Sequence, residues 1–129
     1  MSEIQAVYET GAVADSIDRQ WEAAAGEWLA NLKAERTKKA YMYAWRRFLA
    51  FAEVRPRDVT RRLVISYRNE LKEGEYAPAT IALHLSAISS FYRHAVEAGL
   101  IDSNPVQGVK WPGVEPYAHV KAGVARLTA

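Results

Sequence analysis

Apolar residues recur at intervals of three or four positions near the start of the chain, as they do on one face of a helix. The residues that follow this spacing are Ile17, Trp21, Ala24, Trp28 and Leu32. They predict an amphipathic helix from Ser16 to about Lys33, whose other face is acidic. Residues 1–15 show no sustained periodicity, so we expect them to form a flexible N-terminal arm.

A second helix is predicted from about Thr37 to Ala52, and its two sides differ in character. One side is apolar and carries Tyr41, Ala44, Trp45, Phe48 and Ala52. The opposite side carries Lys39, Met42, Tyr43, Arg46 and Ala50. Because successive residues advance by about 100° around a helix, this arrangement predicts one core-facing side and one basic side that faces solvent.

Two further helices are predicted after Pro56, which interrupts the pattern. Thr60 is a suitable N-terminal cap for a helix through about Glu73, and Gly74 is expected to end that helix in the left-handed conformation. Pro78 suits the first turn of the fourth helix, which is expected to continue up to Gly99. The predicted buried stripe of the fourth helix consists of Ile81, Leu85, Ile88, Tyr92 and Ala95.

The chain after the fourth helix is expected to contain only a short turn. Ser103-Asn104-Pro105 predicts a cap followed by a first-turn proline, with the turn ending before Gly108. Residues 110–129 contain several Pro and Gly residues and little amphipathic order, so we expect a linker there. With no strand-like alternation along the sequence, the predicted class is all-α, with one helical domain over residues 16–109.

The distribution of charge says more than the net charge of +2. Residues 33–62 contain ten Lys and Arg residues against three acidic residues, whereas residues 1–32 contain one basic residue and six acidic residues. A short basic stretch of this kind is typical of a phosphate-binding surface, although many charged stretches are simply solvated.

Several kinds of chemistry are disfavoured by the composition. The chain has no Cys, and its three histidines (His84, His94 and His119) do not stand at metal-ligand spacing. No glycine-rich phosphate loop or nucleophile motif is present, so we expect no metal, no cofactor and no catalysis by this chain. The start lacks the features of a secretory signal and no apolar run is long enough to span a membrane, so a soluble, cytoplasmic protein is expected.

The second and fourth predicted helices offer candidate binding surfaces. Thr37, Lys38, Lys39, Tyr43, Arg46 and Arg47 combine hydroxyl and cationic donors on the second helix. Such a helix suits a DNA major groove, but a solvated helix face explains the same pattern. The fourth helix has small residues at many surface positions, among them Thr80, Ser86 and Ser90. These residues would let a partner approach closely or would simply pack against other helices.

Three groups of residues resemble the N-terminal core-binding domain of the tyrosine recombinases, or phage integrases. The first is Thr37-Lys38-Lys39-Ala40-Tyr41 with Trp45, Phe48 and Phe51. The second is Ala79-Thr80-Ile81 with the run from Leu85-Ser86-Ala87 to Phe91-Tyr92. The third is Gly99-Leu100-Ile101 with Asn104-Pro105 and Gly108-Val109. Their order and spacing match that family from about residue 20 to residue 112.

This resemblance implies a four-helix, SAM-like orthogonal bundle of two crossed helical hairpins, which forms half of a clamp around recombination-site DNA. It implies DNA contacts from the second helix, from Thr80, His84 and Ser90 on the fourth, and from Lys110 where the linker begins. The family often carries Arg near Tyr43 and His84, so these two departures affect the expected strength and base preference of binding. The implied partners are double-stranded DNA, other recombinase protomers and the catalytic domain of the same parent chain.

The resemblance also implies that catalysis belongs to a following domain, with a Tyr nucleophile that Tyr117 does not represent. Arg126-Leu127-Thr128 resembles the point at which such a domain begins. A helical protein-interaction module is the alternative, in which an acidic or aromatic surface would bind another chain. A helix-turn-helix repressor is disfavoured, since the connection from Glu53 to Val59 exceeds the three or four residues of that motif.

Overall fold

The structure is a computed structural model that describes residues 2–111, with side chains placed from Ala12 onward. Its elements are helices α1 (Ser2–Asn31), α2 (Glu35–Ala52), α3 (Arg61–Glu73) and α4 (Pro78–Glu97), with a short 3₁₀ helix, η1 (Pro56–Asp58), between α2 and α3. No strand occurs among these described residues. The prediction of an all-α fold is therefore confirmed.

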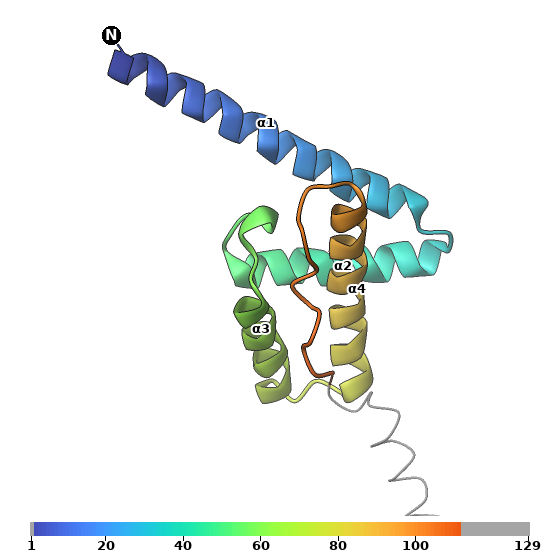
Figure 1. Cartoon of the computed structure of the whole chain (residues 1–129). Helices are drawn as coiled ribbons and strands as arrows, with labels where there is room; N and C mark the ends of the chain where they lie inside the picture. The colour runs from blue at the N-terminus through green and yellow to red at the C-terminus, as the bar shows by residue number, and fades with distance from the viewer. Residues whose placement is uncertain (1, 112–129) are drawn as a thin grey trace, which may run out of the picture.

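Two helical hairpins cross each other in the molecule (Figure 1). Helices α1 and α2 form one hairpin, α3 and α4 form the other, and α2 passes across α4. Helix α4 contacts each of the other three helices, and its interface with α2 is the largest. The arrangement agrees with the expected SAM-like bundle, and it places α4 at the centre of the fold.

The core is unusually aromatic. Trp45 on α2 and Phe91 on α4 have ring centroids 4.3 Å apart, and Trp28 from α1 meets Phe91 edge-on at 5.5 Å. Aromatic rings bury large apolar areas and gain from tilted or edge-to-face packing. The predicted apolar stripes of the four helices lie on this core: Trp21, Trp28, Trp45, Phe48, Val64, Tyr67, Leu71, Ile81, Leu85, Ile88 and Tyr92 are all buried.

Helix α1 begins much earlier than the sequence pattern indicated. The expectation of an arm without regular structure over residues 1–15 is wrong, because α1 is helical from Ser2. This first part of α1 extends beyond the bundle (Figure 1), and Val13 is 59% exposed. A helix needs an apolar stripe only where it packs on a core. Residues 2–14 lack Pro and contain a single Gly, so they can remain helical without such a stripe.

The turns at the two ends of α3 show one confirmed prediction and one error. The Thr60 hydroxyl oxygen accepts a hydrogen bond from the Leu63 N–H at 3.2 Å, as a cap should. Gly74, however, has φ −76°, and the left-handed residue is Glu75 with φ 62°. A Cβ at Gly74 would lie 3.2 Å from the ring of Tyr76. The glycine therefore eases the close approach of that ring and does not adopt a left-handed backbone.

Residues 100–111, which we call the strap, run back along α3 and α4 from the end of α4 towards its beginning (Figure 1). The Asn104 side-chain amide donates to the Ser89 carbonyl at 3.0 Å, and its oxygen accepts from the Val106 N–H at 2.9 Å. Val106 and Val109 are buried and Trp111 packs against the core. The rest of the expected linker, with Tyr117, His119 and Arg126-Leu127-Thr128, lies outside the described residues.

Candidate nucleic-acid interface

Helix α2 presents a basic surface that faces away from the core. Lys39, Tyr43 and Arg46 are exposed, and Thr37 and Arg47 are partly buried. Lys38 lies 3.6 Å from Glu35, the only acidic residue of the helix. After Glu35 there is no Asp or Glu until Glu53, so the potential along this surface is set by cations.

Helix α4 meets this surface with its N-terminal half. Thr80 is partly buried and Leu83 is 40% exposed. From Tyr76 to Val96 the chain contains no Asp or Glu, so α4 adds no opposing charge beside α2. The Tyr43 ring meets the His84 ring edge-on at 6.2 Å, and this contact joins the two helix surfaces. Together they form one surface, which we call the α2/α4 face; the only acidic residue that α2 and the N-terminal half of α4 contribute to it is Glu35.

Arg47 lies where the α2/α4 face reaches the turn between α3 and α4. Its guanidinium donates a hydrogen bond of 2.6 Å to the Tyr76 hydroxyl and lies 5.2 Å from the centroid of the same ring. The hydroxyls of Tyr43 and Tyr76 raise the pKa of Arg47 above its ordinary value, because they stabilise the charged form. The guanidinium is thus held by Tyr76, and Tyr43 further stabilises its charge.

His84, for which the resemblance implies a DNA contact, is buried beneath the surface. Its side chain is 3% exposed, and Nδ1 shares a hydrogen bond of 2.8 Å with the Tyr67 hydroxyl. Burial, and secondarily the charge of Arg47, lower the pKa of His84, so the neutral imidazole is favoured. Burial also raises the pKa of Tyr67 to about 12. In this conformation His84 supports the surface from beneath and offers a partner almost no area.

Ser90 and Lys110 also differ from the simplest expectation. The Ser90 hydroxyl oxygen accepts a hydrogen bond of 2.9 Å from the Trp28 indole N–H, so Ser90 faces α1 and is used in helix packing. The Lys110 side chain is exposed, and its backbone carbonyl accepts a 3.0 Å hydrogen bond from Arg68 on α3. The side of α4 that carries Ser90 is therefore covered, and Lys110 is fixed at the end of the strap.

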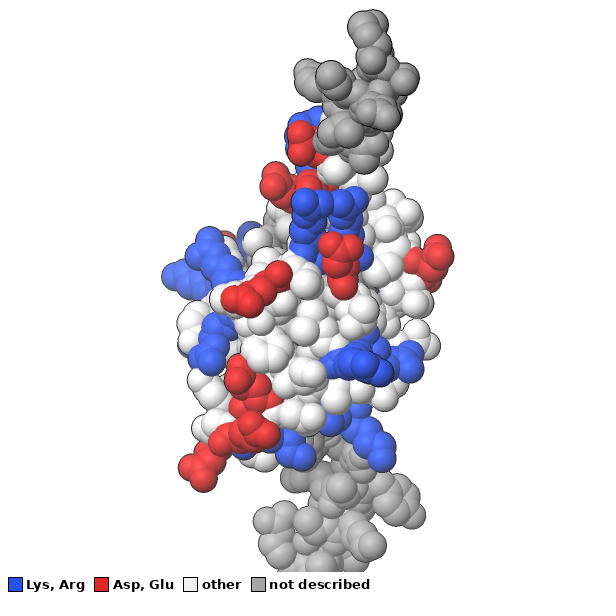
Figure 2. All heavy atoms as spheres, turned by 90° about the vertical axis from the view of Figure 1, so that its left-hand side faces the viewer, with Lys and Arg blue, Asp and Glu red and all other residues white. Residues whose placement is uncertain are grey.

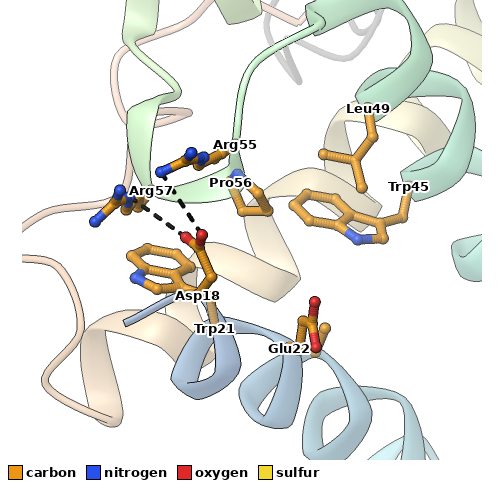
Figure 3. Close-up of a pocket in the computed structure, with 9 residues that line it drawn as sticks. Asp18, Trp21, Glu22, Trp45, Leu49, Arg55, Pro56 and Arg57 are labelled. Carbon is orange, nitrogen blue, oxygen red and sulfur yellow. Dashed lines mark ion pairs between the residues drawn. The ribbon is translucent and has the colours of Figure 1, made fainter. Parts of the chain in front are cut away.

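Part of the basic stretch lies on a different surface. Asp18 on α1 forms ion pairs of 3.6 Å with Arg55 and Arg57 (Figure 3). Arg55 immediately precedes η1, and Arg57 belongs to it. These pairs border a pocket of about 280 Å³ whose apolar wall is formed by Trp21, Trp45, Leu49 and Pro56. Exposed pairs add little stability, but they neutralise the two arginines locally. Within the basic stretch of residues 33–62, Arg55 and Arg57 thus lie at this junction rather than on the α2/α4 face.

The side of the molecule that carries α3 has mixed charge. Figure 2 shows basic side chains there in several separate groups, with acidic side chains between them. Alternating signs cancel at short range, so a polyanion gains less on such a surface than on one lined by cations alone. The α2/α4 face is therefore the better candidate for binding nucleic acid.

The sequence model of the family described as "Phage integrase, N-terminal SAM-like domain" matches residues 29–102. The chain belongs to this family. A curated tyrosine recombinase from Thermosipho africanus (strain TCF52B) is 26% identical over 95 residues, which cover 68% of this chain and 34% of that protein. The chain therefore spans about a third of the length of the curated relative it matches. No solved structure matches the chain.

The described part of this phage-integrase domain shows little that points to other chemistry. Within residues 2–111 no group of three His, Asp or Glu side chains is placed to hold a metal ion. In the same part of the chain, no helix combines the length and the apolar character needed to cross a membrane. The clearest arrangement of functional side chains is the α2/α4 face.

Of the residues predicted for the site, Lys39, Tyr43 and Arg46 are exposed on α2 and Thr80 is partly buried on α4. The contact between Tyr43 and the buried His84 joins the two helices. Tyr67 and Tyr76 were missed by the sequence analysis, although they hold His84 and Arg47. Tyr67 lies on the buried side of α3 and Tyr76 follows a glycine in a turn, so neither stands in a basic pattern. The one signal was the Gly74-Glu75-Tyr76 sequence, in which a glycine leaves room for a ring.

Proposed function

We propose that this domain binds double-stranded DNA through its α2/α4 face, as the non-catalytic part of a tyrosine recombinase. Membership of the phage-integrase family, together with a basic surface whose helices carry no acidic residue between Glu35 and Glu53 on α2 or between Tyr76 and Val96 on α4, supports the proposal. The domain would grip recombination-site DNA while strand cleavage and joining take place elsewhere in the parent protein. DNA, other recombinase protomers and the parent's catalytic domain are the proposed partners.

The proposed contacts are divided by chemistry. Thr37, Lys38, Lys39 and Thr80 are suited to phosphate oxygens, while the exposed Arg46 can present its guanidinium to a guanine edge. Lys110, at the end of the strap, would reach the backbone of the duplex further along. Because phosphate contacts supply most of the affinity, the isolated domain should bind weakly, with a Kd of about 10⁻⁴ to 10⁻⁶ M.

The test is titration of a labelled duplex of about 20 base pairs with the domain at two salt concentrations. Binding should weaken steeply in the higher salt, because counterions released from the phosphates must be recaptured. Replacing both Arg46 and Arg47 with Ala should reduce the affinity about tenfold or more, since each Arg contact contributes about 1–3 kcal/mol. The circular dichroism spectrum should stay unchanged.

A matched control is the double variant R61A/R62A, which removes the same charge from exposed positions at the start of α3. It should weaken binding far less than R46A/R47A. Equal losses in the two double variants would mean that net charge alone matters and would remove the assignment of the α2/α4 face. Affinity that is insensitive to salt would favour a protein-interaction module instead.

A further inference from the structure

Arg46 and Arg47 are neighbours in sequence, but the structure treats them differently. Arg46 is exposed and projects from α2, whereas Arg47 is partly buried and its NH1 group already donates to the Tyr76 hydroxyl. An arginine that reads a base must extend into the groove and present a free, fork-shaped edge. The side chain of Arg47 is partly buried and one of its donor groups is already used by Tyr76, so it is poorly suited to reading a base.

The groups around Arg47 are instead suited to an oxyanion. The Tyr76 hydroxyl accepts a hydrogen bond of 2.6 Å from the NH1 group of Arg47, and Tyr43 lies one helical turn before Arg47 on α2. Both hydroxyls stabilise the charged guanidinium and raise the pKa of Arg47. A phenol oxygen that accepts a hydrogen bond from Arg47 keeps its own O–H proton for donation. A cation with two phenol hydroxyls beside it matches a phosphodiester, which has two acceptor oxygens and one negative charge.

The fold holds this arrangement in place before any ligand arrives. The Tyr76 N–H donates to the Leu71 carbonyl at 3.1 Å, and Gly74 leaves room for the Tyr76 ring, which packs against the core. On the other side, the Tyr43 ring rests against His84, which Tyr67 holds by a hydrogen bond. Arginine side chains normally lose much rotational freedom on binding, so a guanidinium fixed in advance binds at a lower entropic cost.

We propose that Arg47, Tyr43 and Tyr76 form one phosphodiester-binding site on the α2/α4 face, in which Tyr76 positions the guanidinium. This inference rests on the proposed DNA-binding function and assigns Arg47 to the DNA backbone rather than to base reading. Arg47 then sets the register of the domain on the duplex, whereas the choice of sequence falls to exposed groups such as Arg46.

The test compares R47A, Y76F and R46A on two duplexes of unrelated sequence, each over a series of salt concentrations. R47A should weaken binding equally on both duplexes and reduce the slope of log K against log salt by about one. Y76F should weaken binding severalfold on both duplexes, and it should have no further effect in the R47A background. Melting temperatures measured alongside should show that each variant folds.

The possible outcomes separate this inference from the function on which it rests. If the unmodified domain does not bind either duplex at low salt, the proposed function itself fails. If it binds and R46A weakens it, but R47A acts on only one duplex, Arg47 reads a base and the phosphodiester site is wrong. If Y76F leaves the affinity unchanged, or is equally harmful with and without Arg47, Tyr76 does not position the guanidinium.

Discussion

At the scale of single residues, His84 is a polar side chain that is buried beneath the α2/α4 face and hydrogen-bonded within the fold. It is the one buried residue with a polar side chain among those the structure describes, and Tyr67 satisfies its Nδ1 atom. A buried polar group that lacks a partner costs about 1–3 kcal/mol, so the pair stabilises the packing beneath Tyr43. Spacing along α4 alone does not reveal this burial, because the rings of Tyr43 and Tyr67 that lie against His84 belong to other helices.

The buried state of His84 makes stability depend on pH. Its pKa is lowered in the folded protein by burial and by Arg47, whereas in the unfolded chain it has its ordinary value of about 6.5. The unfolded chain therefore takes up the proton more readily. The stabilisation is fully present above about pH 6.5 and is lost as the pH falls below it. Urea denaturation at pH 7.5 and 5.5 should show a lower free energy of unfolding at pH 5.5.

The variant H84Q isolates this effect, because glutamine can still accept a hydrogen bond from Tyr67 but does not titrate. H84Q should lose less stability than the unmodified protein over the same pH interval, whatever its stability at pH 7.5. The matched variant H94Q, on the same helix, retains His84 and should keep the additional loss at acidic pH. Equal losses in the unmodified protein and H84Q would mean that protonation of His84 is not coupled to unfolding.

At the scale of elements, the sequence pattern located the helices that pack on the core and missed the part of a helix that does not. The predicted limits of α2 and α3 lie within two residues of those observed, because apolar spacing marks α2 and the Thr60 cap marks the start of α3. The first half of α1 has neither signal, since it does not pack on the bundle. Gly74 was recognised as the end of α3, but its role depends on the ring of Tyr76, which spacing within one helix does not reveal.

The N-terminal cap of α3 gives a prediction at this scale. Replacing Thr60 with Ala removes the oxygen that accepts the Leu63 N–H, and should lower the free energy of unfolding by about 1 kcal/mol. The variant T60S keeps the hydroxyl and should be close to the unmodified protein in the same urea titration. If T60A and T60S were equally stable, the cap would not contribute to the stability of α3.

At the scale of the whole molecule, the strap determines where the chain leaves the bundle. Residues 100–111 return along α3 and α4, so the described chain ends beside the turn that carries Tyr76 rather than at the far end of α4 (Figure 1). The sequence predicted the turn at Asn104-Pro105, because both residues have strong local preferences. It did not predict the course of the strap, which depends on contacts with Ser89 and Arg68, residues distant in sequence.

Asn104 holds the strap against α4 by hydrogen bonds, and replacing it should lower the stability of the folded protein. Its amide donates to the carbonyl and the hydroxyl of Ser89 on α4, while its oxygen accepts from Val106. The variant N104A leaves these partly buried groups without partners and should cost about 1–3 kcal/mol of stability.

Hydrogen exchange measures where that stability is lost. The Val109 amide, which donates to the Val106 carbonyl within the strap, should exchange faster in N104A, because the strap opens before the bundle unfolds. Amides in the middle of α4 should remain better protected from exchange than the Val109 amide in this variant. The variant S103A, at an exposed neighbouring position, should change neither stability nor exchange. If Val109 stayed protected in N104A, the strap would be held by the packing of Val106, Val109 and Trp111 alone.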